Sequence, residues 1–293
     1  MLGGAEATFT MMDPTTVRVA ATLPGDRRAA TWILPLELEG RSWFSTGRIR
    51  AVGPMTERPI WALGQVEVSA TRHGTVLSSG LDPTDRRLWA ERLDRAAAAV
   101  ASVEPPGGDG WLGGLVVDVP ATGSDFQAIT DELPTAASAL TTCSTGTPRV
   151  VINPQVLDHP VEWLDSTVVH EAVHVATDAP CGRPDQAMNW AVEGLAESVT
   201  ARIYPATAAA NRELVRDYLR DNPMPEALPS ELGDLTDYAL AQLAVDQVRA
   251  HLGKEADDLL ERSMHASGSV TPAELRRVTR WYLSALRRIA ATR

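Results

Sequence analysis

The first 80 residues contain short runs in which apolar and polar residues partly alternate, as they do in half-buried β-strands. Gly, Pro and Asp separate these runs, and His73-Gly74 stands where a hairpin turn would join two of them. The pattern predicts a small antiparallel sheet. The predicted strands are Val17–Val19, Trp32–Leu38, Trp43–Ser45 with Ile49 and Val52 beyond it, Gln65–Ser69 and Thr75–Leu77.

The pattern becomes helical at Asp82-Pro83-Thr84-Asp85, which supplies an N-cap, a Pro at the first helical position and an acid in the first turn. This helix is expected to reach about Val103, and Pro105-Pro106-Gly107-Gly108 then breaks the chain. The elements predicted beyond that linker are strands at Leu115–Val119, Ala136–Thr142 and Arg149–Asn153, a short helix from Ser124 to Asp131, and almost continuous helix from Val161 onward.

These elements predict an α+β protein in two parts. Residues 1–104 would form an N-terminal β lobe with its connecting helix. Residues 105–293 would form a second domain, in which a small mixed sheet is followed by a helical half.

The amino-acid composition argues against several classes of function. A hydrophobic share of 44% can build a sizeable core, and the net charge of −11 argues against binding to nucleic acid or to an anionic membrane. No apolar run approaches the roughly 18 residues that a membrane span needs. The residues from Met1 to Glu6 lack the pattern of a signal peptide. A complete chain is therefore expected in the cytoplasm, and an extracytoplasmic protein would have lost a signal or anchor.

The most informative segment is His170-Glu171-Ala172-Val173-His174, an H-E-x-x-H sequence inside an apolar helical run. Residues four apart on a helix lie about 40° apart in azimuth and about 6 Å apart along the axis, so two imidazoles can converge on one ion. Glu171 between them is placed to accept a proton from water. The alternative is a pair of solvated or capping histidines, which fits the apolar context less well.

A catalytic zinc site needs a third protein ligand. Eighteen residues separate His174 from Glu193, enough to end one helix, cross a loop and begin the next. Glu193 is the candidate. Glu197, one turn further, could accept a hydrogen bond from a ligand histidine. Asp178, one turn after His174, is a weaker candidate for that supporting role, and a solvated acid at the helix end is its alternative.

This combination, H-E-x-x-H followed by Glu within W-x-x-E-G-x-A, resembles the gluzincin metallopeptidases. The spacing is most similar to the M1 aminopeptidase and leukotriene A4 hydrolase group. The resemblance implies a zincin-like fold in which His170, His174 and Glu193 hold one zinc ion per chain and Glu171 is the general base. In the similar thermolysin family, an acid four residues after the ligand Glu supports the site, and Glu197 occupies that place here.

A second match begins at Tyr238 and runs to Gly253, where the sequence resembles the Tyr-led helix that follows the zinc helices in M1-like enzymes. The resemblance implies that the Tyr238 hydroxyl stabilises an oxyanion, and a core tyrosine is the alternative. The G-x-M-E-N strand of M1 aminopeptidases is missing, and the chain is far shorter than those enzymes. It is more similar to short peptidase-MA-like proteins of actinobacteria, whose W-x-L-G segment resembles Trp61–Gly64.

The expected function is hydrolysis of a peptide or amide bond, with Glu171 taking the proton from the attacking water and returning it to the leaving amine. The expected partner is a peptide or protein substrate lying along an edge strand at residues 136–142. Two alternatives remain: the same zinc site acting on a non-peptide substrate, and a non-catalytic zinc-binding or scaffold protein. Cys143 and Cys181 could form one bridge or remain two thiols.

Overall fold

The computed structural model describes residues 6–39, 42–45, 50–51, 58–108, 110–132, 137–182, 184–265 and 270–292. The predicted strand positions Ile49, Val52 and Ala136 lie outside these residues. The described chain is mixed α+β, with nine α-helices and two sheets. It packs as two compact units: residues 1–98 with 111–175, and residues 99–110 with 176–293.

The first sheet of the first unit is antiparallel, as the sequence predicts for the N-terminus. It contains β1 (Glu6–Asp13), β2 (Thr16–Thr22), β3 (Ala30–Glu39), β4 (Ser42–Ser45) and β5 (Arg50–Ala51). Alternate residues of β2 and β3, including Val17, Val19 and Trp32, are buried in its core. Strand β1 was not predicted, although Ala7, Phe9 and Met11 alternate there with polar residues. Its side chains are exposed along the whole strand.

The second sheet of this unit is mixed, with the order β6-β7-β8-β10-β9. Its central strands are parallel and both outer strands are antiparallel. The predicted hairpin around His73-Gly74 is present, but it joins this sheet rather than the N-terminal one, since β7 pairs with β8. The strands are β6 (Glu67–Ala70), β7 (Gly74–Ser78), β8 (Leu115–Val119), β9 (Ala139–Thr142) and β10 (Arg149–Ile152).

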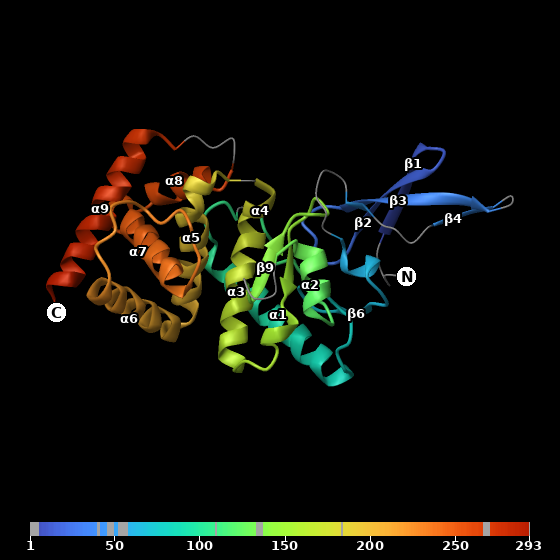
Figure 1. Cartoon of the computed structure of the whole chain (residues 1–293), viewed down its shortest axis with the longest axis horizontal. Coiled ribbons are helices and arrows are strands. Elements are labelled where there is room, and N and C mark those ends of the chain that lie inside the picture. The colour runs from blue at the N-terminus through green and yellow to red at the C-terminus, as the bar shows by residue number, and fades with distance from the viewer. Residues whose placement is uncertain are drawn as a thin grey trace. The chain divides into compact units, whose positions relative to one another are not determined.

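Helices pack around this mixed sheet. The helices and 3-10 turns of the unit are α1 (Pro83–Val103), α2 (Gly123–Thr130), α3 (Val161–Thr177), η1 (Ile60–Ala62) and η2 (Pro154–Val156). Phe126 and Ile129 of α2 share a core cluster with Val116 of β8. Arg92 of α1 donates a 2.7 Å hydrogen bond to Asp165 of α3 and so links those two helices. Figure 1 shows α3 beside the edge strand β9.

A buried charge cluster lies within the first unit. Arg149, the first residue of β10, makes a two-point ion pair with Asp26, at 3.0 and 2.7 Å. Arg149 also stacks over the ring of Trp61. Asp118 of β8 is buried, and burial raises the pKa of its carboxyl to about 7, opposed by the charge of Arg149 and reinforced by that of Asp26.

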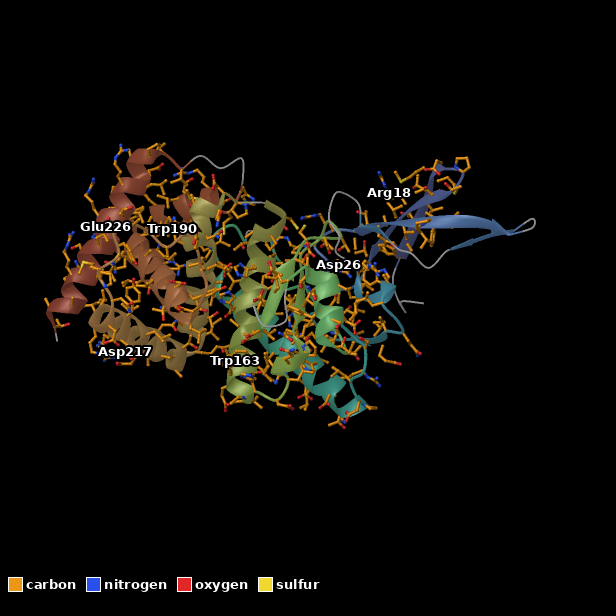
Figure 2. All side chains as sticks on the ribbon, in the orientation of Figure 1. Arg18, Asp26, Trp163, Trp190, Asp217 and Glu226 are labelled. Carbon is orange, nitrogen blue, oxygen red and sulfur yellow. The ribbon has the colours of Figure 1, made fainter. Side chains whose placement is uncertain are left out.

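The second unit is helical, as predicted for the C-terminal half. It contains α4 (Ala179–Gly182), η3 (Gln186–Met188), α5 (Asn189–Ile203), α6 (Pro205–Asp221), α7 (Leu235–Leu252), α8 (Glu255–Ser263) and α9 (Pro272–Ala291). Trp190 of α5 is fully buried among these helices (Figure 2). Within the described residues, no helix combines the length and the apolar character needed to cross a membrane.

Glycine sets the distance between α5 and α7. A Cβ atom at Gly194 would lie 2.3 Å from the carbonyl oxygen of Ala241, much closer than such atoms approach in proteins. Only a residue without a side chain lets the two backbones meet there. The contact fixes α5, which carries Glu193, against α7, which carries Tyr238.

Candidate metal centre

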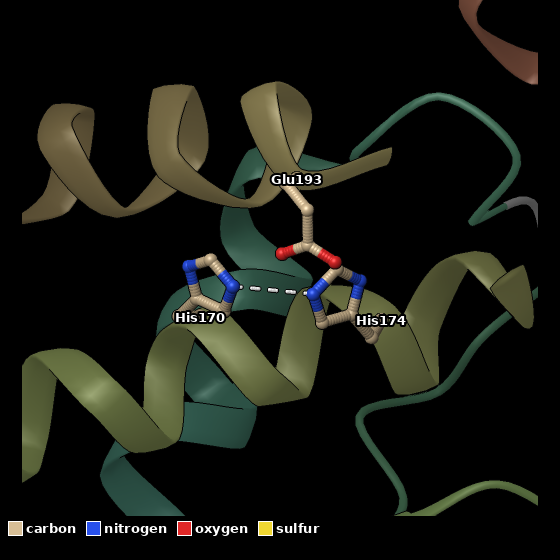
Figure 3. A group of neighbouring side chains, drawn as sticks. All are labelled: His170, His174 and Glu193. Carbon is tan, nitrogen blue, oxygen red and sulfur yellow. Dashed lines mark hydrogen bonds between the residues drawn. The ribbon is translucent and has the colours of Figure 1, made fainter. Parts of the chain in front are cut away.

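His170 and His174 lie one turn apart on α3, and their rings face each other through the Nε2 atoms (Figure 3). The two Nε2 atoms are 3.2 Å apart, with the ring planes inclined at 74°. The helix forms here because its apolar residues, among them Val169 and Val173, are fully buried. That packing turns the two histidines to a common side.

The spacing of the two nitrogens fits a shared metal ion. Zinc–nitrogen bonds of about 2.0–2.1 Å meeting at a tetrahedral angle place the two nitrogens about 3.3 Å apart. The observed 3.2 Å is close to this value. The same distance would also suit a direct hydrogen bond, in which one ring keeps its Nε2 proton and the other accepts it.

Glu193 of α5 completes the group. One ligand atom from each of His170, His174 and Glu193 lies within 4.8 Å of the others. Figure 3 shows the carboxylate of Glu193 turned toward both imidazoles. His174 is buried, whereas His170 and Glu193 are half-buried. Two imidazoles and one carboxylate can therefore hold a divalent metal ion, and this donor set suits several transition metals besides zinc.

Glu171 points to the side of α3 that meets the mixed sheet. Its side chain is buried, and its Oε2 accepts a 2.7 Å hydrogen bond from the hydroxyl of Thr141 in β9. The same hydroxyl is 3.1 Å from the backbone carbonyl oxygen of Glu171. The candidate base is thus anchored to the edge strand of the sheet.

Glu197 lies one turn after Glu193 and belongs to a polar network of the helical unit. Asn211 of α6 donates to Glu197 Oε2 at 2.9 Å and to Gln242 of α7 at 2.7 Å. Gln242 in turn donates to Asp246, which also accepts a hydrogen bond from Ser198. Burial raises the pKa of Asp246, and the hydrogen bonds from Ser198 and Gln242 oppose that rise.

Tyr238 lies in the first turn of α7 and is half-buried. Gly194 of α5 meets Ala241 of α7, and Ser198, one turn later, bonds to Asp246. The two helices therefore run in the same general direction. Tyr238 therefore lies about one helical turn before the level at which Gly194 meets Ala241. Its predicted role as a donor to the oxyanion stays a prediction.

Asp178 ends α3. Its backbone is left-handed, with φ of 57°, and its carbonyl accepts hydrogen bonds from the amides of Cys181 and Gly182. Asp tolerates this conformation better than most residues, which explains an acid at this position without a metal. Its predicted supporting role at the metal site stays a prediction.

Both cysteines are disulfide-bonded. Because the chain contains only Cys143 and Cys181, they form a single bridge. Of the two alternatives that the sequence left open, the structure has the bridge. Cys143 directly follows β9, and Cys181 lies in the short helix after α3.

Sequence reasoning missed two residues of this region, Thr141 and Asn211. Thr141 stands in a short strand whose composition gives no sign of chemistry, and its contact with Glu171 spans 30 positions. Asn211 lies mid-helix in α6, where a polar residue ordinarily faces solvent. Thr141 lies within the predicted edge strand at residues 136–142, but nothing in the composition of that strand distinguishes it, and the sequence gives no signal for Asn211.

Comparison of this chain with protein-family models, with curated proteins and with solved structures gives no match.

Proposed function

We propose that this protein is a zinc-dependent hydrolase of peptide or amide bonds, with a zincin-like core of the gluzincin type. The observation that carries the proposal is the convergence of His170, His174 and Glu193. The sequence places Glu171 between the two histidines, where a base is needed. The half-buried state of His170 and Glu193 supports access for a substrate.

His170, His174 and Glu193 would hold the metal. Bound zinc lowers the pKa of a coordinated water toward 7 and polarises a carbonyl group. Glu171 accepts a proton from the attacking water and returns it to the leaving amine. Tyr238, as a neutral donor at pH 7, hydrogen-bonds the oxygen on which negative charge develops.

An extended peptide is the substrate that fits the proposal best. Strand β9 pairs only with β10 among the described strands, so its other edge can accept a further strand. A peptide added there would be held by main-chain hydrogen bonds. The strand also carries Thr141, the partner of Glu171, which brings the bound peptide to the level of the base.

Turnover of a casein or dye-labelled peptide substrate tests this function. The wild-type protein should cleave it in the presence of zinc, and Glu171→Gln should keep the metal and lose cleavage, because the base is not a ligand. Glu162→Gln provides the matched control, since Glu162 is exposed in the first turn of the same helix. It should behave as the wild type.

Two results would favour a function other than peptide hydrolysis. Zinc binding with no cleavage of any peptide, but with cleavage of small esters or amides that Glu171→Gln abolishes, would indicate a non-peptide substrate. Zinc binding with no hydrolysis of either kind would indicate a scaffold role.

A further inference from the structure

Strand β9 supplies the side chain that holds the candidate base. The side chains of β9 alternate: Leu140 packs into the cluster that contains Phe126 of α2, whereas Thr141 faces α3. Both Thr141 and Glu171 are 7% exposed, so solvent competes little for their contact. We propose that Thr141 is a positioning residue for Glu171. This inference rests on the proposed function.

The geometry of the hydroxyl explains how it would act. A threonine has one O–H donor, and both acceptors within reach, Oε2 at 2.7 Å and the carbonyl oxygen at 3.1 Å, belong to Glu171. The shorter contact has the length of a charge-assisted O–H···O⁻ bond, which is about twice as strong as a neutral one. The Thr141 hydroxyl therefore holds the Glu171 side chain close to the backbone carbonyl of Glu171 itself.

Because of this bond, the two oxygens of the Glu171 carboxylate have different roles. Oε2 is occupied by Thr141, and no described residue donates a hydrogen bond to Oε1. Oε1 thus remains as the proton acceptor, held in one direction. Because β9 would also bind the substrate, one strand would align both the scissile bond and the base. A base misplaced by about 1 Å can lose a hundredfold in rate.

The first test compares Thr141→Val, which keeps the shape and removes the donor, with Thr141→Ser, which keeps the donor. The metal-loaded full chain with Val should show kcat lower by about 10- to 100-fold with KM and zinc content unchanged. The Ser variant should restore kcat. Thr130→Val is the control, since it removes another buried hydroxyl, which bonds to the carbonyl oxygen of Phe126 in α2. It should leave kcat unchanged.

A crystal structure of each Thr141 variant separates this inference from the proposed function. The Glu171 carboxylate should leave its position in Thr141→Val and keep it in Thr141→Ser. A carboxylate that stays in place in the Val variant, or a Val variant with wild-type kcat, overturns the role of Thr141. If the carboxylate moves as expected but the wild type shows no turnover, the positioning role stands and the hydrolase assignment fails.

Discussion

Asn211 and Glu197 are joined by a 2.9 Å hydrogen bond from the amide of Asn211 to Oε2 of Glu197. The same amide also bonds to Gln242, so α6 ties together α5 and α7 one turn beyond Glu193. In the proposed function, Glu197 would accept a hydrogen bond from the far nitrogen of a ligand histidine. Such partners fix the ring orientation and raise its basicity.

The first prediction follows from that arrangement. Glu197→Ala should weaken zinc affinity by about 10- to 100-fold without abolishing binding, because it removes the support and leaves the ligands. Competition with a zinc-sensitive dye measures the change. Glu213→Ala is the control, since Glu213 is an exposed acid of α6. Equal zinc affinities of the Glu197 variant and the control would show that Glu197 does not support the metal site.

Tyr238→Phe should lower kcat by about 10²- to 10³-fold, since it removes one donor to the developing oxyanion. KM should change little, because this interaction strengthens only in the transition state. Steady-state kinetics together with zinc analysis make the measurement, and Tyr218→Phe on α6 is the matched change elsewhere in the helical unit. Full activity of Tyr238→Phe would mean that the oxyanion donor lies on another residue.

Much of the fold could be predicted because its elements carry strong local signals. The Asp82-Pro83 pair correctly predicted that α1 begins at Pro83, and the apolar run Leu115–Val119 coincides with β8. The assignment of β6 and β7 to the second sheet could not be predicted. Pairing between distant strands depends on tertiary packing, and here Gly74 of β7 must lie directly against the backbone of Leu115 in β8.

Some residues of the candidate site could also be predicted from the sequence, and others could not. His170, His174 and Glu193 could be chosen from the sequence because helical spacing and residue type carry the information. Thr141 and Asn211 could not, since their partners lie on other elements and any strand threonine or helix asparagine looks alike. The pairing of Cys143 with Cys181 was also open, because a sequence does not show the distance between two thiols.

Asp118 makes stability depend on pH. Its pKa rises from an ordinary 3.8 to about 7 on folding. Below about pH 4 both states hold the proton. Between pH 4 and 7 the folded chain keeps a proton that the unfolded chain has released, so the free energy of unfolding falls as the pH rises. Above pH 7 the loss is complete and amounts to on the order of 4 kcal/mol.

The Asp118→Asn variant should not lose stability in this way as the pH rises, because its amide does not ionise. Its thermal midpoint should match the wild type near pH 4 and exceed it at pH 8, as measured by calorimetry across this range. Asp158→Asn, a change at an exposed position, should follow the wild type at every pH. A variant of Asp118 that loses stability at pH 8 would show that the ionised carboxylate stabilises Arg149 more than its burial costs.

The disulfide predicts no free thiol in denatured, unreduced protein. Cys143 and Cys181 are 181 − 143 = 38 positions apart, and closing a loop of that length stabilises the fold by about 3–4 kcal/mol in the chain-entropy model. Urea unfolding with and without reductant measures the difference, and the double variant Cys143→Ser, Cys181→Ser should be insensitive to reductant. Two free thiols would instead indicate a protein of a reducing compartment.

Metal content tests the central claim most directly. The full chain, loaded with zinc and dialysed, should contain one equivalent of zinc by elemental analysis. The double variant His170→Ala, His174→Ala should contain none, and Glu171→Gln should retain the full amount. A wild-type protein that holds no metal after loading, or a double variant that holds a full equivalent, would contradict the assignment of His170, His174 and Glu193 as ligands.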